Sequence, residues 1–538
     1  MKLQVYSANE WLYPDQSITD SSDPRISLIS ARDSFASCQI LMNALPEQSE
    51  LVFTFQSEQP DSHSNQAGLA FFAFQLLDVQ VNENTDVDVS TIPVGTSAPS
   101  YVTRQAPFRV YDALIPVHGS SMPPAPTAAY YLCWDIPEHV SPGAYHGQLT
   151  IRVNEHAYAV PVHLEVSAAR VPAKGHLQIT NWYSIRNIAD RHGLELWSEP
   201  FWSMLEQYLK AMRRCRQTHV MVDHAFVDIE KQADGGYHFD FTKAERLVAL
   251  CLELGFTHIE GGHVGKRINW EDPTFVLNSN PSIQATSKEG YEFISRYLAA
   301  WRSWLDQKGW LPLLVQHVAD EPIEPSAADY RILTGIVRKC LPGVPLIDAV
   351  INTSVAGAVD IWVPTNKEYE LNRQAYEDYR KLGDMLWFYT CWNPGGEYLN
   401  RFLDFPLLKT RYLHWGNYKY DLAGYLHWGF NYYFKDQDPF ELTNPLLAPH
   451  VHNRRVPAGD THLVYPGPDG PLLSMRLEAM RAGVEDYELL RSLGKHHPEL
   501  AQDIAASCMT SFKEVNTNPE AFDAAYRRLL ESVSAYPE

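Results

Sequence analysis

The chain has 538 residues, of which 45% are hydrophobic and 20% are charged, so it has the composition of a folded globular protein with more than one domain. Its 44 basic and 65 acidic residues give a formal net charge of −21. This charge disfavours sequence-independent binding to nucleic acid, which depends on Lys and Arg side chains, and equally disfavours an anionic membrane surface.

Targeting and membrane-spanning segments are not expected. The N-terminus lacks the apolar stretch of a signal peptide, and no run of 18 uncharged apolar residues occurs. The seven cysteines are scattered and form no Cys-x-x-Cys pair, which indicates neither a disulfide framework nor a zinc ribbon. A reducing cytoplasm is the simplest location, and a processed or truncated form would show the same pattern.

Residues 1–170 predict an all-β domain of the β-sandwich type. Short runs of alternating polarity recur between turn residues at 35–42, 51–55, 69–79, 108–111 and 129–134. Two longer runs, 143–153 and 157–166, are separated by Asn154-Glu155-His156, which predicts a hairpin. The polar stretch 61–66 predicts a loop.

Residues 171–435 predict a (β/α)8 barrel of the TIM type, because strand-like runs alternate with amphipathic helical stretches. Candidate strands lie at 177–183, 219–226, 257–261, 313–320, 346–351, 361–364, 385–391 and 424–430. Apolar residues have helical spacing at 202–212, 242–254, 291–308 and 327–340. An open doubly wound sheet would show the same alternation, but no Gly-x-Gly-x-x-Gly follows the first strand, so dinucleotide binding has no support.

Residues 436–538 predict a final barrel helix and a C-terminal cap. The stretch 439–470 is irregular and rich in Pro and Gly, whereas 474–493 and 498–533 have helical character. The predicted fold is therefore multidomain, with a β-sandwich, a TIM-type barrel and a helical C-terminal tail.

The sharpest feature at a predicted strand end is Asp320-Glu321-Pro322. Two carboxylates there would be costly in a core, and Pro322 ends the strand. Side chains alternate between the two faces of a strand, so both carboxylates can serve one pocket only if the backbone departs from regular geometry. Alternatively, Glu321 merely starts the next helix and Asp320 binds a barrel Arg or Lys.

Aromatic residues gather between Trp387 and Tyr433, where 16 of 47 residues are Phe, Trp or Tyr against 12% in the whole chain. Some must fill the barrel wall, yet Trp387, Tyr389 and Trp392 cluster at one predicted strand end. Sugar rings present apolar C–H faces that stack on aromatic rings, while their hydroxyls bond Asp, Glu, His and Asn. This mixture fits a glycan better than a phosphate or a lipid.

Histidines also fall at predicted strand ends, namely at His224, His263, His317 and His427. They could meet around a metal ion, but a metal-dependent barrel hydrolase usually opens with His-x-His on the first strand, where this chain has Asn181-Trp182-Tyr183. We therefore expect neither a metal nor another cofactor. No Gly-x-Ser-x-Gly elbow occurs, so a serine hydrolase has no support.

An ordered set of segments carries a family resemblance. They are Ala319–Pro322, Trp387–Pro394, Phe405-Pro406, Arg411, Trp415, Gly424–Trp428, Tyr465–Gly467, Ser474–Glu478 and Arg481–Tyr487. Together they resemble glycoside hydrolase family 123, the β-N-acetylgalactosaminidases, over about 300 residues. One departure is Thr461, at a position where the resemblance would place a glycine.

The resemblance implies a retaining exo-β-N-acetylgalactosaminidase with substrate-assisted catalysis, an exception to the usual two-carboxylate scheme. Glu321 would be the general acid, and Asp320 would orient the 2-acetamido group whose oxygen attacks the anomeric carbon to give an oxazoline. The substrate would be a small carbohydrate or glycoconjugate with a terminal β-linked N-acetylhexosamine. Further substrate contacts are expected from position at Tyr389, Trp392, Trp428, His263, Asn181 and His224.

Among these contacts, Tyr389 is expected at the acetamido carbonyl, and the two tryptophans at the walls of the −1 pocket. Three other functions stay open. One is a two-carboxylate glycosidase of other specificity, for example for β-N-acetylglucosaminides, with Glu260 or Glu397 as nucleophile. The others are a non-catalytic glycan-binding protein and a metal-dependent hydrolase. Galacto or gluco configuration, the aglycone, the oligomeric state and the role of the sandwich are left open.

Overall fold

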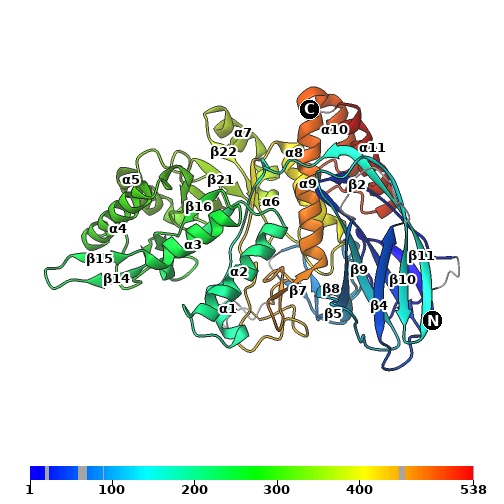
Figure 1. Cartoon of the computed structure of the whole chain (residues 1–538). Helices are drawn as coiled ribbons and strands as arrows, with labels where there is room; N and C mark the ends of the chain where they lie inside the picture. Colours follow the sequence, from blue (N-terminus) through cyan, green and yellow to red (C-terminus); the bar gives the residue numbers. More distant parts are fainter. Residues whose placement is uncertain (19–22, 58–68, 89, 447–454, 537–538) are drawn as a thin grey trace.

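The computed structural model describes residues 1–18, 23–57, 69–88, 90–446 and 455–536, and the loop predicted at 61–66 lies outside them. A β-sheet-rich N-terminal region is followed by a part in which short parallel strands alternate with helices, and the chain ends in helices (Figure 1). Among the described residues, every helix is too short or too polar to serve as a membrane span.

Two sheets form the N-terminal region. Their strands are β1 (Lys2–Ser7), β2 (Ile26–Arg32), β3 (Ser34–Asn43), β4 (Leu51–Ser57), β5 (Ala70–Val81), β8 (Phe108–Pro116), β9 (Ala128–Ile136), β10 (Gly143–Val153) and β11 (His156–Arg170). The smaller sheet has the order β2-β11-β10-β4. The predicted runs are confirmed as strands, and the hairpin is confirmed by the pairing of Val153 with His156. Strands β1 and β2 were not predicted from the sequence.

The larger sheet has the order β1-β3-β9-β5-β8-β26-β25, and its last two strands come from the far end of the chain. They are β25 (Tyr465–Pro466) and β26 (Pro471–Ser474), and Ser474 pairs with Ala113 of β8. Both faces of this sheet carry buried side chains. Ile40 of β3 packs toward the smaller sheet, whereas its neighbour Leu41 joins a cluster that includes Leu403 and Met475 from the second half of the chain.

Short parallel strands make up the second part. They are β12 (Gln178–Asn181), β13 (His219–Val222), β16 (His258–Gly261), β19 (Leu314–Gln316), β20 (Ile347–Val350), β21 (Ile361–Pro364), β22 (Met385–Leu386), β23 (Phe388–Tyr389) and β24 (Gly424–His427). All eight predicted strand positions are confirmed. The strand at 361–364 has the predicted bounds, the run at 385–391 contains two short strands, and the other strands are shorter than predicted. The strands pair as β13-β16-β19, β20-β21-β22 and β12-β24-β23.

Single contacts join these three groups. A bridge between Gln316 and Leu346 links β19 to the start of β20, and one between Thr365 and Tyr389 links the end of β21 to β23. The Thr218 N–H donates to the Ile179 carbonyl at 3.0 Å, just before β13. Each strand therefore neighbours the next one along the chain, and the last, β24, neighbours the first.

Helices connect the strands: α1 (Ile185–His192), α2 (Glu199–Arg214), α3 (Thr242–Glu253), α4 (Lys288–Gln307), α5 (Ala327–Cys340), α6 (Asn366–Leu371), α7 (Arg373–Lys381) and α8 (Leu408–Tyr420). Ser198 and Ser287 begin α2 and α4, because each serine side chain accepts an N–H that the first turn leaves free. The four predicted helices are confirmed.

Three helices end the chain: α9 (Met475–His496), α10 (Pro498–Cys508) and α11 (Pro519–Ala535). The predicted helical run 498–533 is interrupted because Asn518 caps α11 and Pro519 suits only its first turn. The division of the chain at residues 170 and 435 stays a prediction.

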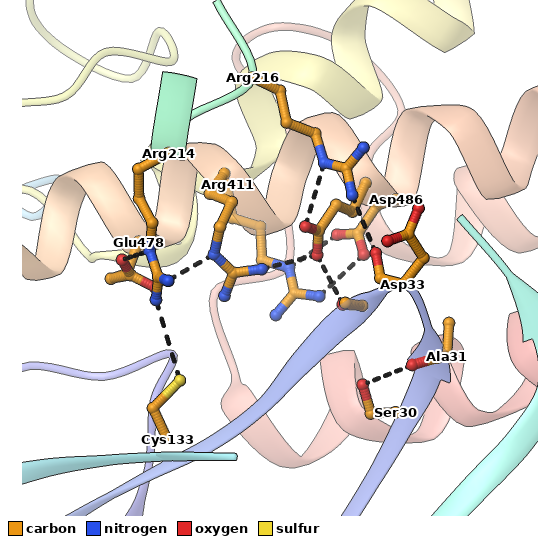
Figure 2. A network of polar contacts seen from close by, with 12 residues as sticks. Ser30, Ala31, Asp33, Cys133, Arg214, Arg216, Arg411, Glu478 and Asp486 are labelled. Atoms are coloured by element: carbon orange, nitrogen blue, oxygen red, sulfur yellow. Dashed lines mark hydrogen bonds and ion pairs between the residues drawn. The ribbon is translucent and has the colours of Figure 1, made fainter. Parts of the chain in front are cut away.

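α9 runs between the N-terminal sheets and the parallel strands and carries buried charges toward both (Figure 1). Glu478 accepts from Arg214 of α2 at 2.7 and 3.0 Å and from the hydroxyl of Tyr131 in β9 at 3.1 Å. Asp486 binds Arg411 of α8 at 2.7 and 2.8 Å (Figure 2). α9 therefore joins strands and helices that lie hundreds of residues apart.

These charges are stable in the interior because each has a partner. Burial alone would raise the pKa of Glu478, but Arg214 and Arg481 lower it to about 2. At the start of α9, the fully buried Arg476 Nε donates to Asp112 of β8 at 3.0 Å. A buried ion pair contributes little net stability compared with apolar packing, but the loss of one partner leaves an uncompensated charge.

Replacement of Arg476 with Met leaves the Asp112 carboxylate buried without its cation, and we expect the free energy of unfolding to fall by about 3–5 kcal/mol. Urea unfolding measures the loss. The control is Arg528→Met, which removes an exposed pair with Asp503 at 2.9 Å and should cost about 1 kcal/mol or less. Equal losses in the two variants would contradict this account of α9.

Candidate active site

The carboxyl ends of the parallel strands open into a cavity of about 710 Å³. Its lining comes from the segments that follow β12, β13, β16, β19, β23 and β24. Active groups gather at this edge in folds of alternating strands and helices, because loops there can vary without disturbing the core. Of the residues proposed from the sequence, the cavity is lined by Asp320, Glu321, Tyr389, Trp392, Trp428 and His263.

Asp320 and Glu321 both line the cavity although they are adjacent in the chain. Glu321 has a φ of 45°, in the left-handed region that costs a non-glycine residue on the order of 1–3 kcal/mol. This turn lies beyond the end of β19 at Gln316 and brings both carboxylates to one cavity, which the alternating faces of a regular strand would prevent. The departure from strand geometry that a shared pocket requires is therefore present.

Contacts with three residues hold the strained turn. The Glu321 N–H donates to the Ala349 carbonyl at 3.1 Å. Arg267 Nη2 donates to the Glu321 carbonyl at 2.7 Å and reaches that of Asp320 at 3.4 Å. The Tyr389 hydroxyl donates to Glu321 Oε1. Backbone and side chain of Glu321 are thus both anchored, which offsets the cost of the turn.

Beneath this turn, His317 lies between two buried carboxylates. Its Nδ1 donates to Asp348 Oδ1 at 3.0 Å and its Nε2 to Glu260 Oε2 at 3.1 Å. Burial alone would lower the pKa of His317, but the bonds to Asp348 and Glu260 raise it to about 9. The ring is therefore protonated at neutral pH, and its charge compensates the two carboxylates.

Asp348 also sets the path of the chain into the turn. Its carboxylate accepts the N–H groups of Val318 and Ala319 at 3.0 and 3.1 Å, and the Tyr330 hydroxyl. These two N–H groups come directly before Asp320. The position of the carboxylate pair therefore depends on a residue of the next strand, β20.

The two carboxyls of the turn hold their protons more strongly than ordinary carboxyls. Although Asp320 is open to the cavity, enclosure by the cavity walls raises its pKa well above the ordinary value, with the charges of Glu321 and Asp348 as further causes. Enclosure also raises the pKa of Glu321, against the effects of Tyr389 and Arg267. The pair titrates as a unit, because ionisation of one member opposes that of the other.

Aromatic rings form one wall of the cavity. The centroids of Trp392 and Trp428 lie 6.5 Å apart with their planes tilted by 47°. Trp428 Nε1 donates to Asp460 Oδ2 at 2.9 Å, which fixes the ring. The prediction that Trp387 lies at the same opening is wrong. Trp387 is fully buried, and its ring packs edge-on against His219 with the centroids 5.1 Å apart.

Of the histidine and asparagine residues predicted to contact substrate, only His263 lines the cavity. His263 lines the cavity, and burial, followed by the nearby His317 and His224, lowers its pKa well below the ordinary value, so its ring is neutral. The structure does not bring His224 to the lining: its Nε2 donates to the His263 carbonyl at 3.0 Å. Asn181 is also outside, buried between Gln217 and Arg401 at 3.1 Å from each.

Neither alternative nucleophile lies in the cavity lining. Glu260 is fully buried, and its Oε2 accepts from Trp182 and His317 at 3.0 and 3.1 Å. Glu397 is exposed and lies outside the lining. A two-carboxylate scheme that uses either residue therefore lacks support from the geometry.

One group of side chains has the spacing of a metal site. Ligand atoms of His263, His317 and Asp348 lie within 4.8 Å of one another. Both nitrogens of His317 already donate to carboxylates, and its raised pKa keeps the ring protonated. A metal would bind only after His317 gave up a proton and one of these partners, so the donor set fits a metal poorly.

Three residues that contact the cavity residues were not predicted as site residues, namely Asp348, Arg267 and Asp460. A carboxylate within the apolar strand 346–351 was a usable signal for Asp348, because such a group must be paired. Asp460 lies in the irregular stretch beside Thr461, and Arg267 in a loop, where neither has a local signal. Both are recognisable only by their contacts with the cavity residues.

A family model described as the catalytic domain of glycoside hydrolase 123 matches residues 182–493. No curated protein matches the chain. A family 123 glycoside hydrolase from Clostridium perfringens, solved in a study of glycolipid glycan hydrolysis, has a TM-score of 0.72 at 16% identity, over 100% of this chain and 98% of that one. This likeness shows the fold.

Two further solved structures are more distant. A family 10 xylanase with a bacterial Ig-like domain, from termite gut, has a TM-score of 0.33 at 11% identity over 67% of this chain and 90% of that one. A β-galactosidase from the psychrophilic Marinomonas ef1 has a TM-score of 0.37 at 10% identity over 62% of each chain. These values carry no argument about the fold.

The raised pKa of His317 makes the stability of the protein depend on pH. Because the pKa rises from 6.5 to about 9 on folding, the stabilisation is complete below pH 6.5 and is lost as the pH rises through 9. Between these values, the unfolding free energy of the wild type should fall more steeply than that of His317→Gln, by on the order of 3 kcal/mol.

Urea unfolding at pH 6, 7.5 and 9 measures this difference. The control is His496→Gln, which alters an exposed histidine and should follow the wild type at each pH. Parallel curves for the wild type and His317→Gln would contradict the protonated state of His317.

Proposed function

The chain belongs to glycoside hydrolase family 123, and on that premise we propose that it is a retaining exo-β-N-acetylgalactosaminidase that uses the 2-acetamido group of its substrate as nucleophile. The observation that carries the proposal is the Asp320–Glu321 turn, in which two adjacent carboxyls with raised pKa values face one cavity. An aromatic wall completes a pocket suited to a sugar ring.

Glu321 is the general acid of this proposal. Its raised pKa favours the protonated form more than in an ordinary carboxyl, and an acid for a leaving oxygen must carry that proton. The Tyr389 hydroxyl binds Oε1 and leaves Oε2 free for the glycosidic oxygen. This contact supports a role for Tyr389 in orienting the acid, whereas the sequence placed it at the acetamido carbonyl.

Asp320 orients the acetamido group. Without substrate its pKa is raised, but an amide N–H donated by the substrate favours the charged carboxylate and so promotes loss of the proton. The carboxylate then holds the acetamido oxygen toward the anomeric carbon and stabilises the positive charge that develops on the group. The adjacent carboxyls thus take different roles because they have different partners.

The reaction has two steps. The acetamido oxygen bonds to the anomeric carbon while the bond to the aglycone breaks and its oxygen takes the Glu321 proton. Water, deprotonated by Glu321, then attacks the anomeric carbon and opens the oxazoline, which gives net retention. Trp392 and Trp428 are proposed to enclose the sugar ring, and the neutral His263 to bind one of its hydroxyls.

We further propose that the parallel strands form one (β/α)8 barrel of the TIM type. The order of pairing supports it, because each strand neighbours the next one along the chain and β24 pairs with β12. For the substrate, the Clostridium perfringens enzyme was studied for glycolipid glycan hydrolysis, which supports a glycoconjugate with a terminal β-linked N-acetylgalactosamine.

Replacement of Glu321 with Gln removes the proton of the general acid. On phenyl β-N-acetylgalactosaminide, whose leaving group needs protonation, we expect kcat to fall by a factor of about 10² or more. The control is Glu397→Gln, an exposed carboxylate outside the cavity lining, which should retain wild-type activity. Activity of Glu321→Gln within about tenfold of wild type would rule out the proposed role.

The assisting role of the substrate predicts a distinct inhibition pattern. Aryl 2-acetamido glycosides of galacto and gluco configuration should be tested with wild type and Asp320→Asn, with and without a thiazoline that mimics the oxazoline. We expect a preference for the galacto substrate, competitive inhibition by the thiazoline, and a fall of about 10² in kcat for Asp320→Asn.

Other results would favour other functions. Turnover of substrates without a 2-acetamido group, together with no inhibition by the thiazoline, would indicate a two-carboxylate glycosidase. Sugar binding without turnover across the panel would indicate a glycan-binding protein. Activity abolished by a chelator would indicate a metal-dependent hydrolase.

A further inference from the structure

A row of four aromatic rings lines the cavity, formed by Trp392, Trp428, Tyr432 and Phe434. Successive ring centroids lie 6.5, 5.1 and 5.6 Å apart. The row begins beside the carboxylate pair, because Trp392 closely follows Tyr389, whose hydroxyl binds Glu321. Trp428, Tyr432 and Phe434 continue this row along the lining of the same cavity.

Tyr432 is the most open ring of this row. Its side chain is 41% exposed, and within the described part of the chain its hydroxyl has no hydrogen-bond partner. The next residue, Tyr433, is buried and donates its hydroxyl to the Val464 carbonyl at 2.6 Å. One tyrosine of the two serves the core, and the other presents a large apolar face to the cavity.

The segment that carries Tyr432 is held in place before any ligand binds. A Cβ at Gly429 would lie 2.8 Å from the Thr461 carbonyl oxygen, so this close approach of two backbones requires glycine. The same carbonyl accepts the Tyr432 N–H at 3.0 Å, and Asn431 Oδ1 accepts the Ser184 N–H at 2.9 Å. A ring on a fixed backbone loses little entropy when a ligand stacks on it.

The cavity also has room for more than one sugar. Its volume of about 710 Å³ is in the range of pockets that enclose drug-sized ligands, which are larger than a single pyranose. The carboxylate pair, Trp392 and Trp428 account for one sugar ring. Tyr432 and Phe434 are the next two rings of the row, and the proposed reaction does not use them.

We propose that Tyr432 and Phe434 form a second subsite, in which the sugar that carries the terminal N-acetylhexosamine stacks on the Tyr432 ring. The inference rests on the proposed function, since that function assigns the terminal sugar to the Asp320–Glu321 end. Pyranose C–H faces stack on aromatic rings, so the subsite selects a saccharide over a small alkyl group as aglycone. The open Tyr432 face is the surface on which this selection depends.

The test compares two substrates, methyl β-N-acetylgalactosaminide and the disaccharide in which the same sugar is β-linked to galactose. The readout is the ratio of kcat/KM for the disaccharide to that for the methyl glycoside. We expect Tyr432→Ala to lower this ratio by roughly 5- to 10-fold, and Tyr432→Phe to keep it, because stacking needs the ring and not the hydroxyl. The control is Phe72→Ala, which removes a 46% exposed ring from the N-terminal region and should leave the ratio unchanged.

An unchanged ratio in Tyr432→Ala overturns the subsite. If the wild type hydrolyses neither glycoside, the proposed function fails, and calorimetric titration of both glycosides into wild type and Tyr432→Ala then decides the subsite separately. Weaker binding of the disaccharide alone by Tyr432→Ala supports it. Equal affinities in the two proteins, or no binding by either, overturn it.

Discussion

The cation of His317 between Glu260 and Asp348 is the interaction on which the edge that carries the cavity depends. Three ionisable groups are fully buried there, which is possible because one positive ring donates to two carboxylates. Asp348 also accepts the N–H groups of the two residues before Asp320. The carboxylate that His317 compensates therefore also positions the chain that leads to Asp320. The strained turn at Glu321 comes next along the chain. Its strained backbone conformation persists because the surrounding contacts hold it in place.

Compensation of buried charge also joins the two halves of the chain. α9 directs Arg476 and Glu478 toward the N-terminal sheet and Asp486 toward α8. Strands of the larger sheet contribute side chains to two hydrophobic clusters, one shared with the smaller sheet and one shared with the second half of the chain. This supports a brace as the role of the sandwich, which holds the last strands and helices against the part that carries the cavity.

The sequence predicted where the cavity lies more accurately than it predicted which individual side chains line it. Asp320 and Glu321 could be proposed because two carboxylates after an apolar run need a reason to be there. Trp392 and Trp428 line the cavity as expected, whereas Trp387 is core and Asn181 faces Gln217 and Arg401. A strand-end position does not say which face a residue occupies, because alternation fixes faces only relative to a known neighbour.

The sequence by itself determined the order of the parallel strands, the positions of the four predicted helices between them and the carboxylate pair. Burial repeats every two residues in a strand and about every 3.6 in a helix, so such elements leave a local pattern. Only the tertiary structure decided what lies beside these elements. β26 pairs with β8, Asp460 orients Trp428, and Arg267 holds the Glu321 carbonyl. Such contacts join residues far apart in the chain, and their geometry depends on the packing of the whole molecule, which no local pattern records.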